Sequence, residues 1–206
     1  ADALEINNKP NVTEYNLSAS FTDVTGVSID EALAIVDIDG TDLAGNPVDA
    51  SAVDIIDEIG DIRTAISDGV LGSGNVLEGA DVHATVADVA DALEIFVGQD
   101  TSGAASQLDN VVTTFELMED TTGAIDSSVS LGNLTIQEAQ AVYNASNADK
   151  IESISISDSF SAFNSEKSWL QANVNNNIHI EDITLTEGNQ LVSEHDTTFA
   201  GLTYTF

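Results

Sequence analysis

Cysteine is absent from this chain of 206 residues, and basic side chains are scarce. Without cysteine there are no disulfides, no thiolate metal ligands and no cysteine nucleophile. Lys and Arg number 4 against 36 Asp and Glu, which gives a formal net charge of -32. So few cations neutralise neither a row of phosphates nor an anionic lipid surface. The charge balance therefore excludes an ordinary nucleic-acid binder and a basic membrane-surface module.

Long hydrophobic runs are also missing, since no stretch approaches the roughly 18 apolar residues of a membrane span, and we expect no membrane insertion. Hydrophobic residues nevertheless make up 42% of the chain. Disorder requires low hydrophobicity together with high charge, so the chain is expected to fold. The acidity and the first residue, Ala1, which no Met or apolar signal core precedes, favour a prokaryotic extracellular or cell-surface protein.

Three pairs of residues have the spacing of a helix N-terminal capping box, in which a hydroxyl residue stands three positions before an acid. They are Ser28 with Glu31, Thr85 with Asp88, and Thr135 with Glu138. Apolar residues at helical spacing predict further helices over residues 52–66 and 108–118, and a short helix over 163–174.

Apolar and polar residues alternate in four other segments, which predicts strands. These segments are 12–24, 150–160, 178–185 with an irregularity near Asp182, and 202–206. The predicted fold class is therefore α+β, with short helices alternating with short strands and strands at both termini. Residues 1–100 and 101–206 are expected to form two similar lobes or one single domain.

The segments that follow Val27, Ala84 and Leu134 resemble one another, which indicates an approximate internal repeat. Around the first and third, the similarity extends to Ile55-Ile-Asp and to Ile154-Ser-Ile-Ser-Asp. The alternative is that any acidic capping box followed by Ala and Leu looks like this.

The stretch Leu134-Thr-Ile-Gln-Glu-Ala-Gln-Ala-Val-Tyr, followed by Ile154-Ser-Ile-Ser-Asp-Ser-Phe, resembles repeats of large secreted surface proteins of bacteria, cyanobacteria among them. The resemblance implies a surface-layer, adhesin or calcium-binding exoprotein context. The Gly-Gly-x-Gly-x-Asp nonapeptides common in calcium-binding exoproteins are absent from this sequence.

An acidic loop offers hard oxygen ligands at closely spaced positions, a pattern that suits Ca²⁺: Asp37, Asp39, Thr41 and Asp42. It is not an EF-hand, because Asp42 stands where that loop requires glycine and Val48 where it requires glutamate. Solvated loop carboxylates remain the alternative. Further acids are candidates for other cation contacts: Asp57, Glu58, Asp61 and Asp81.

The sequence contains no catalytic motif that can be assigned, and we expect no enzyme activity. The three histidines, His83, His179 and His195, stand in no recognised zinc-ligand spacing. Glycoside hydrolysis requires a pair of carboxylates, but with 36 acids the sequence nominates none.

The alternating terminal segments provide strands that pair inside the domain or with another copy of the chain. The residues that carry this assembly hypothesis are Tyr15, Leu17, Phe21, Leu202, Tyr204 and Phe206. The preferred function is a structural subunit of an extracellular surface layer or filament, which self-associates through these strands and through Ca²⁺ between acidic faces.

Two alternatives to this function stay open. The first is a calcium-binding adhesion module of a larger surface protein, with cell-surface glycans among its partners. The second is a secreted polysaccharide hydrolase.

Overall fold

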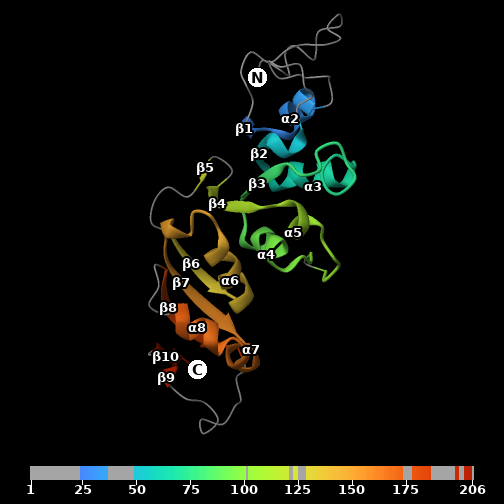
Figure 1. The fold of residues 1–206 in the computed structure, drawn as a ribbon. Coiled ribbons are helices and arrows are strands. Elements are labelled where there is room, and N and C mark those ends of the chain that lie inside the picture. Colours follow the sequence, from blue (N-terminus) through green and yellow to red (C-terminus); the bar gives the residue numbers. More distant parts are fainter. Residues whose placement is uncertain are drawn as a thin grey trace, which may run out of the picture. The chain divides into compact units, whose positions relative to one another are not determined.

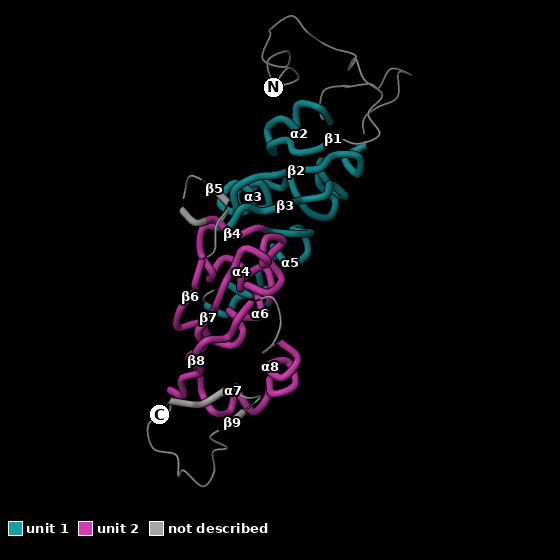
Figure 2. Tube along the Cα trace, turned by 90° about the vertical axis from the view of Figure 1, so that its left-hand side faces the viewer, with its two compact units in different colours: residues 1–86, 97–115 teal, residues 87–96, 116–206 magenta. Residues whose placement is uncertain are grey.

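The computed structural model describes residues 24–36, 49–100, 102–120, 123–124, 129–173, 178–186, 198–199 and 202–205. In it helices and strands alternate, which confirms the expected mixture of short helices and short strands (Figure 1). The chain divides into two compact units, coloured in Figure 2. Unit 1 contains residues 1–86 and 97–115, and unit 2 contains residues 87–96 and 116–206. The chain therefore passes between the units more than once, and not at a single junction near residue 100.

Unit 1 is built on parallel strands that follow one another in chain order. Its elements are β1 (Val24–Val27), α2 (Ile29–Val36), the 3-10 turn η1 (Ala50–Ala52), β2 (Val53–Glu58), α3 (Ile59–Ser67), β3 (Asp81–Val86), α5 (Leu108–Val111) and the first residues of β4 (Thr114–Asp120). Helix α4 (Val89–Val97) follows β3, and all but its last residue belongs to unit 2.

Unit 2 contains a second, mostly parallel sheet with the strand order β6-β7-β8-β10-β9. Its further elements are β5 (Gly123–Ala124), β6 (Val129–Leu134), α6 (Ile136–Asn144), the 3-10 turn η2 (Ala148–Lys150), β7 (Ile151–Asp158), α7 (Phe160–Ser165), α8 (Lys167–Asn173), β8 (His179–Leu185), β9 (Thr198–Phe199) and β10 (Leu202–Thr205). Only the β9–β10 and β4–β5 pairs are described as antiparallel.

Each parallel sheet has one face buried in the core. In β2, Val53 and Ile55 are buried, whereas Ile56, whose side chain is on the opposite face, is 45% exposed. Helices α2 and α3 pack against β2. In unit 2, Ile154 and Ile156 of β7 are buried in the same way, and α6 packs against β7. The opposite face of β2 and β3, which we call the open face, carries Asp54, Asp81 and His83 together with Ile56.

Several expected elements are confirmed. Helices α2 and α6 begin next to Ser28 and Thr135, and β7 and β8 coincide with the predicted strands. The irregularity near Asp182 is also present, because the register between β7 and β8 shifts after Ile154, which pairs with Ile180. The next pair joins Ser155 to Asp182, so one extra residue of β8 bulges between them.

The expected helix over residues 52–66 is wrong in its first half, which forms β2. Alternation of Val53 and Ile55 with Asp54 fits a pleated strand with one buried face, and this pattern outweighs the helical spacing of the later isoleucines. The helix begins only at Ile59.

Two other helix predictions need correction. Thr85 lies inside β3, and the cap of α4 is Asp88, whose Oδ1 accepts a hydrogen bond from the Ala90 N–H at 2.6 Å. The predicted helix over 108–118 ends at Val111, because the β-favouring segment from Thr114 onward joins a sheet as β4.

Residues 12–23 of the predicted N-terminal strand, including Tyr15, Leu17 and Phe21, lie outside the described residues, and its last residue, Val24, begins β1. The C-terminal strand is present as β10, which pairs with β8 on one side and with β9 on the other. Among the described helices, none has both the length and the apolarity to cross a bilayer.

Candidate functional site

A carboxylate at the end of β2 joins this strand to the start of the preceding helix. The Oδ2 atom of Asp57 accepts a hydrogen bond from the N–H of Ile29, the first residue of α2, at 3.0 Å. Its Oδ1 atom accepts another from the Glu58 N–H at 3.0 Å. Because the first N–H groups of a helix have no partner within the helix, Asp57 satisfies one of them from the neighbouring strand.

Asp158 does the same in unit 2. Its Oδ2 atom accepts a hydrogen bond from the N–H of Ile136, the first residue of α6, at 3.0 Å. Its Oδ1 atom accepts one from the Ser159 N–H at 2.7 Å. We call this arrangement, in which a strand-end aspartate binds both the preceding helix and its own following residue, the strand-end latch.

The helix start that each latch holds is also built alike. Ser28 and Glu31 exchange backbone-to-side-chain hydrogen bonds of 3.3 Å, which is the predicted capping box. Thr135 and Glu138 form the same box, with the Thr135 N–H donating to Glu138 at 2.6 Å.

The residue two positions before each cap has a left-handed backbone, with φ of 70° at Gly26 and 59° at Asn133. These are residue types that adopt this conformation readily. The sequence repeat of the segments after Val27 and Leu134 thus corresponds to a repeated piece of structure. The segment after Ala84 does not share it.

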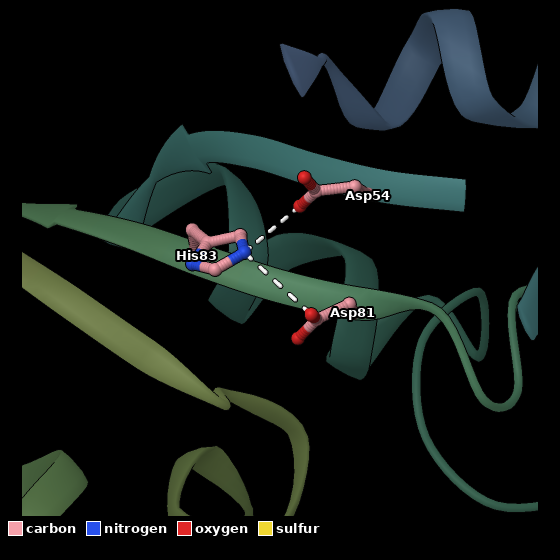
Figure 3. A group of neighbouring side chains, drawn as sticks. All are labelled: Asp54, Asp81 and His83. Carbon is pink, nitrogen blue, oxygen red and sulfur yellow. Dashed lines mark ion pairs between the residues drawn. The ribbon is translucent and has the colours of Figure 1, made fainter. Parts of the chain in front are cut away.

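The open face of unit 1 brings together the ligand atoms of Asp54, Asp81 and His83 (Figure 3). Asp54 is on β2, and Asp81 and His83 are on β3, where Asp54 pairs with Asp81 in the sheet register. The His83 Nε2 atom lies 2.9 Å from Asp54 Oδ1 and 3.7 Å from Asp81 Oδ2. Among the described residues this is the one group of such side chains close enough to hold a metal ion in common.

The other ring nitrogen of His83 is held by a third strand. Nδ1 is hydrogen-bonded to Oγ1 of Thr114, the first residue of β4. The imidazole is therefore fixed at both nitrogens and positioned by side chains from three adjacent strands. Its exposed fraction is 31%, against 28% for Asp54 and 53% for Asp81, so the group is open to solvent on one side.

In unit 2 the face of β7 opposite Ile154 and Ile156 carries serine hydroxyls instead, and Ser153 among them is only 2% exposed. The Ser153 hydroxyl is hydrogen-bonded to the Ser130 hydroxyl of β6 at 2.7 Å. Ser155 Oγ accepts a hydrogen bond from the N–H of Asn133 at 3.2 Å, which supports the left-handed residue before the cap.

A pocket of about 330 Å³ lies between α2 and α3 in unit 1, and carboxylates line it. Its acids are Asp30, Asp57, Asp61 and Asp68. Both oxygens of Asp57 are engaged by backbone N–H groups, so this carboxylate has a structural role there.

The predicted calcium loop and part of the predicted assembly strands lie outside the residues that the structure describes. Asp37, Asp39, Thr41 and Asp42 lie outside the described residues, as do Tyr15, Leu17, Phe21, Phe206 and His195. Leu202 and Tyr204 belong to β10. His179 is exposed at the start of β8 in unit 2.

From the sequence, Asp57 and Asp81 are candidates only for general cation contacts, and His83 has no assigned partner. The alternation Asp81-Val82-His83 was an available signal, since the buried Val82 places its two neighbours on the opposite face. Asp54 had no such signal, because only the register between β2 and β3 places it beside His83.

Comparisons of the chain with family models, with curated proteins and with solved structures found no match.

Proposed function

We propose that this chain is a non-enzymatic structural repeat module of an extracellular assembly. The observation that carries the proposal is the recurrence of the strand-end latch, with Asp57 in unit 1 and Asp158 in unit 2. In both places the aspartate binds the start of the helix that precedes its own strand. In each unit, one latch of this kind connects a strand to the helix that precedes it.

Repeats that contact mainly their sequence neighbours form extended scaffolds, in which further repeats are added without changing the existing ones. The parallel strands β1, β2 and β3 follow this logic, because they are adjacent in chain order and each is joined to the next by a helix-containing connection. Extended scaffolds of this type suit a surface layer or filament, where the chain has to cover distance.

The acids whose pKa values are shifted support a structural role. Hydrogen bonds from the backbone N–H and hydroxyl of Ser51 lower the pKa of Asp49 below its usual range. The Ser102 hydroxyl and the N–H groups of Ala104 and Ser102 do the same for Asp100. A general acid for glycoside hydrolysis requires a shift in the opposite direction, toward a raised pKa.

Association is proposed to depend on cations. A net charge of -32 makes copies of the chain repel one another, and divalent ions such as Ca²⁺ relieve the repulsion by bridging carboxylates. Terminal strands are the second proposed contact. Because β10 is paired on both sides within its own chain, its use between copies requires an exchange of strands.

The test is light scattering and negative-stain electron microscopy of the purified chain with millimolar Ca²⁺, with a chelator, and with NaCl at the same ionic strength. The NaCl sample separates bridging by Ca²⁺ from simple screening of charge. We expect filaments or sheets with Ca²⁺ and dispersed particles in the other two samples.

Monomers under all three conditions would overturn the proposal. If Ca²⁺ then raises the unfolding temperature of the monomer, the calcium-binding adhesion module becomes the better account.

A further inference from the structure

We propose that Asp54, Asp81 and His83 form a binding site for a zinc-like divalent transition-metal ion on the open face of unit 1. The inference is independent of the proposed assembly function. It rests on the ligand types, on their spacing, and on the way in which His83 is held.

The spacing of the ligand atoms matches a tetrahedral ion. Zinc binds imidazole nitrogen and carboxylate oxygen at about 2.0–2.2 Å, so two ligand atoms of a tetrahedral site stand about 3.4 Å apart. The two measured distances from His83 Nε2, 2.9 Å to Asp54 and 3.7 Å to Asp81, lie on either side of this value. All three ligand atoms lie within 4.8 Å of one another. Small side-chain movements bring them to one ion.

Thr114 supplies the outer support that metal-binding histidines usually have. When the ring carries its proton on Nδ1, that N–H donates to Thr114 Oγ1 and the lone pair of Nε2 points outward as a ligand. Thr114 comes from β4, a different strand from the ligands, so this support is not part of the acidic group itself.

Asp54 places a shielded oxygen beside the same nitrogen. Its Oδ1 atom makes no hydrogen bond, its ion-pair partner is His83 Nε2 at 2.9 Å, and the side chain as a whole is 28% exposed. When the proton of the ring is on Nδ1, Nε2 has no hydrogen to donate to this oxygen. A cation bound by both atoms then gives each of them a partner. The exposed side chain of Asp81 leaves room for a water molecule as the fourth ligand.

The ligand set distinguishes this site from the predicted calcium loop. Ca²⁺ takes six to eight oxygen ligands, whereas an imidazole nitrogen with two carboxylates suits Zn²⁺ or Co²⁺. The competing explanation is a simple ion pair between a protonated His83 and Asp54, and the experiment must separate the two.

We suggest isothermal titration calorimetry of the full chain, freed of zinc beforehand, with Zn²⁺ as the titrant. The buffer contains millimolar Mg²⁺ and Ca²⁺, which occupy the other acidic surfaces. A parallel titration with Co²⁺, followed by visible absorption, reports the coordination geometry. The variants are His83→Asn, Asp54→Asn and Thr114→Val. The matched control is His179→Asn, which removes an exposed histidine from a strand of unit 2. Circular dichroism verifies that each variant is folded.

We expect one saturable Zn²⁺ site in the wild-type chain and in His179→Asn. Its affinity should fall more than tenfold in His83→Asn and Asp54→Asn, and by about tenfold in Thr114→Val through loss of ligand support. The proposal is overturned if His83→Asn binds Zn²⁺ as His179→Asn does, or if the wild-type chain shows no saturable Zn²⁺ binding in this buffer.

Discussion

The two units use the same strand-end latch and differ on the sheet face opposite the buried isoleucines. Asp57 and Asp158 make equivalent hydrogen bonds, and both latches hold a helix that begins with a capping box. The open face of unit 1 carries the group around His83, whereas the corresponding face of β7 in unit 2 carries serines, of which Ser153 is buried and hydrogen-bonded to Ser130.

The difference shows which positions the fold constrains. Positions that satisfy helix N–H groups or fill the core have similar side chains in the two units, because their hydrogen bonds and volumes are required for folding. Asp54, Asp81 and His83, on the open face of unit 1, neither satisfy a helix N–H group nor fill the core. Such positions are therefore where one unit can acquire a binding site that the other lacks.

The largest effects are expected from the equivalent core residues Ile55 and Ile156. They pair with Val27 and Leu134, the residues before the two caps, and they are 0% and 1% exposed. Replacing either by alanine removes buried apolar contacts, and we expect a loss of about 2–5 kcal/mol in the free energy of unfolding. Urea unfolding followed by circular dichroism measures this loss.

Ile56→Ala, at a position 45% exposed, is the control and should change stability by about 0.5 kcal/mol or less. If Ile156→Ala destabilised the chain no more than the control Ile56→Ala, Ile156 would not have in unit 2 the core role that Ile55 has in unit 1.

The second-largest effects on stability are expected from the two latch aspartates. Asp57→Ala and Asp158→Ala each leave a helix N–H without its acceptor, and we expect each to cost about 1–3 kcal/mol. Amide hydrogen exchange monitored by NMR locates the effect, since the Ile29 amide should lose protection in the first variant and the Ile136 amide in the second. Glu152→Ala, which changes an exposed acid of β7, serves as the charge control. Unchanged protection of both amides would mean that the latches contribute nothing to the helix starts.

Tyr143 provides a way to weaken unit 2 selectively at high pH. It is half-buried in α6, and its hydroxyl donates a hydrogen bond to the Ile178 carbonyl at 2.9 Å. Burial raises the pKa of this phenol to about 12 from 10.0. Below pH 10 both folded and unfolded chains keep the proton; between pH 10 and 12 only the unfolded chain releases it, so stability falls as the pH rises. After allowance for solvent screening, we expect a loss on the order of 1 kcal/mol.

Unfolding curves at pH 9 and pH 11.5 measure this loss. Tyr143→Phe is the control, because a phenyl ring has no proton to release, and the other tyrosines remain in that variant. A pH dependence that is the same in the wild-type chain and in Tyr143→Phe would contradict the assignment.

The smallest effect is expected from exchanging the left-handed residues. Gly26→Asn and Asn133→Gly transfer the residue of one unit to the other, and both residue types tolerate a positive φ. Of the residues that the structure describes, a Cβ atom at Gly26 meets Ile56 at its Cδ1 atom, at 3.7 Å, which is an ordinary contact. Each exchange should change stability by about 0.5 kcal/mol or less, as measured by thermal unfolding. Gly26→Val, which forces a branched side chain into this conformation, should cost about 1–2 kcal/mol and serves as the comparison.

Local patterns in the sequence predicted the parts of this fold that depend on local interactions. The capping boxes at Ser28 and Thr135 are made between residues three positions apart, so their spacing is visible in the sequence. Thr85 with Asp88 has the same spacing, but pairing of β3 with β2 holds Thr85 in a strand. Tertiary contacts outweighed the local signal there.

The latches and the proposed metal site depend on sheet register, and their partners are far apart in the sequence. Asp57 is 28 positions from Ile29, and nothing in the local pattern of either residue indicates the other. The repetition of Ile-x-Asp, as Ile55-Ile-Asp57 and Ile156-Ser-Asp158, is the one local clue in the sequence.

The latch also explains how the chain tolerates growth. From the cap to the latch aspartate there are 29 positions in unit 1, between Ser28 and Asp57, and only 23 in unit 2, between Thr135 and Asp158. The helix start and the strand end are fixed, so the extra residues fall between the end of α2 and the start of β2, where added chain length costs little. Residues inserted in this connection should therefore lengthen the polypeptide without changing the hydrogen bonds between the helix start and the strand end.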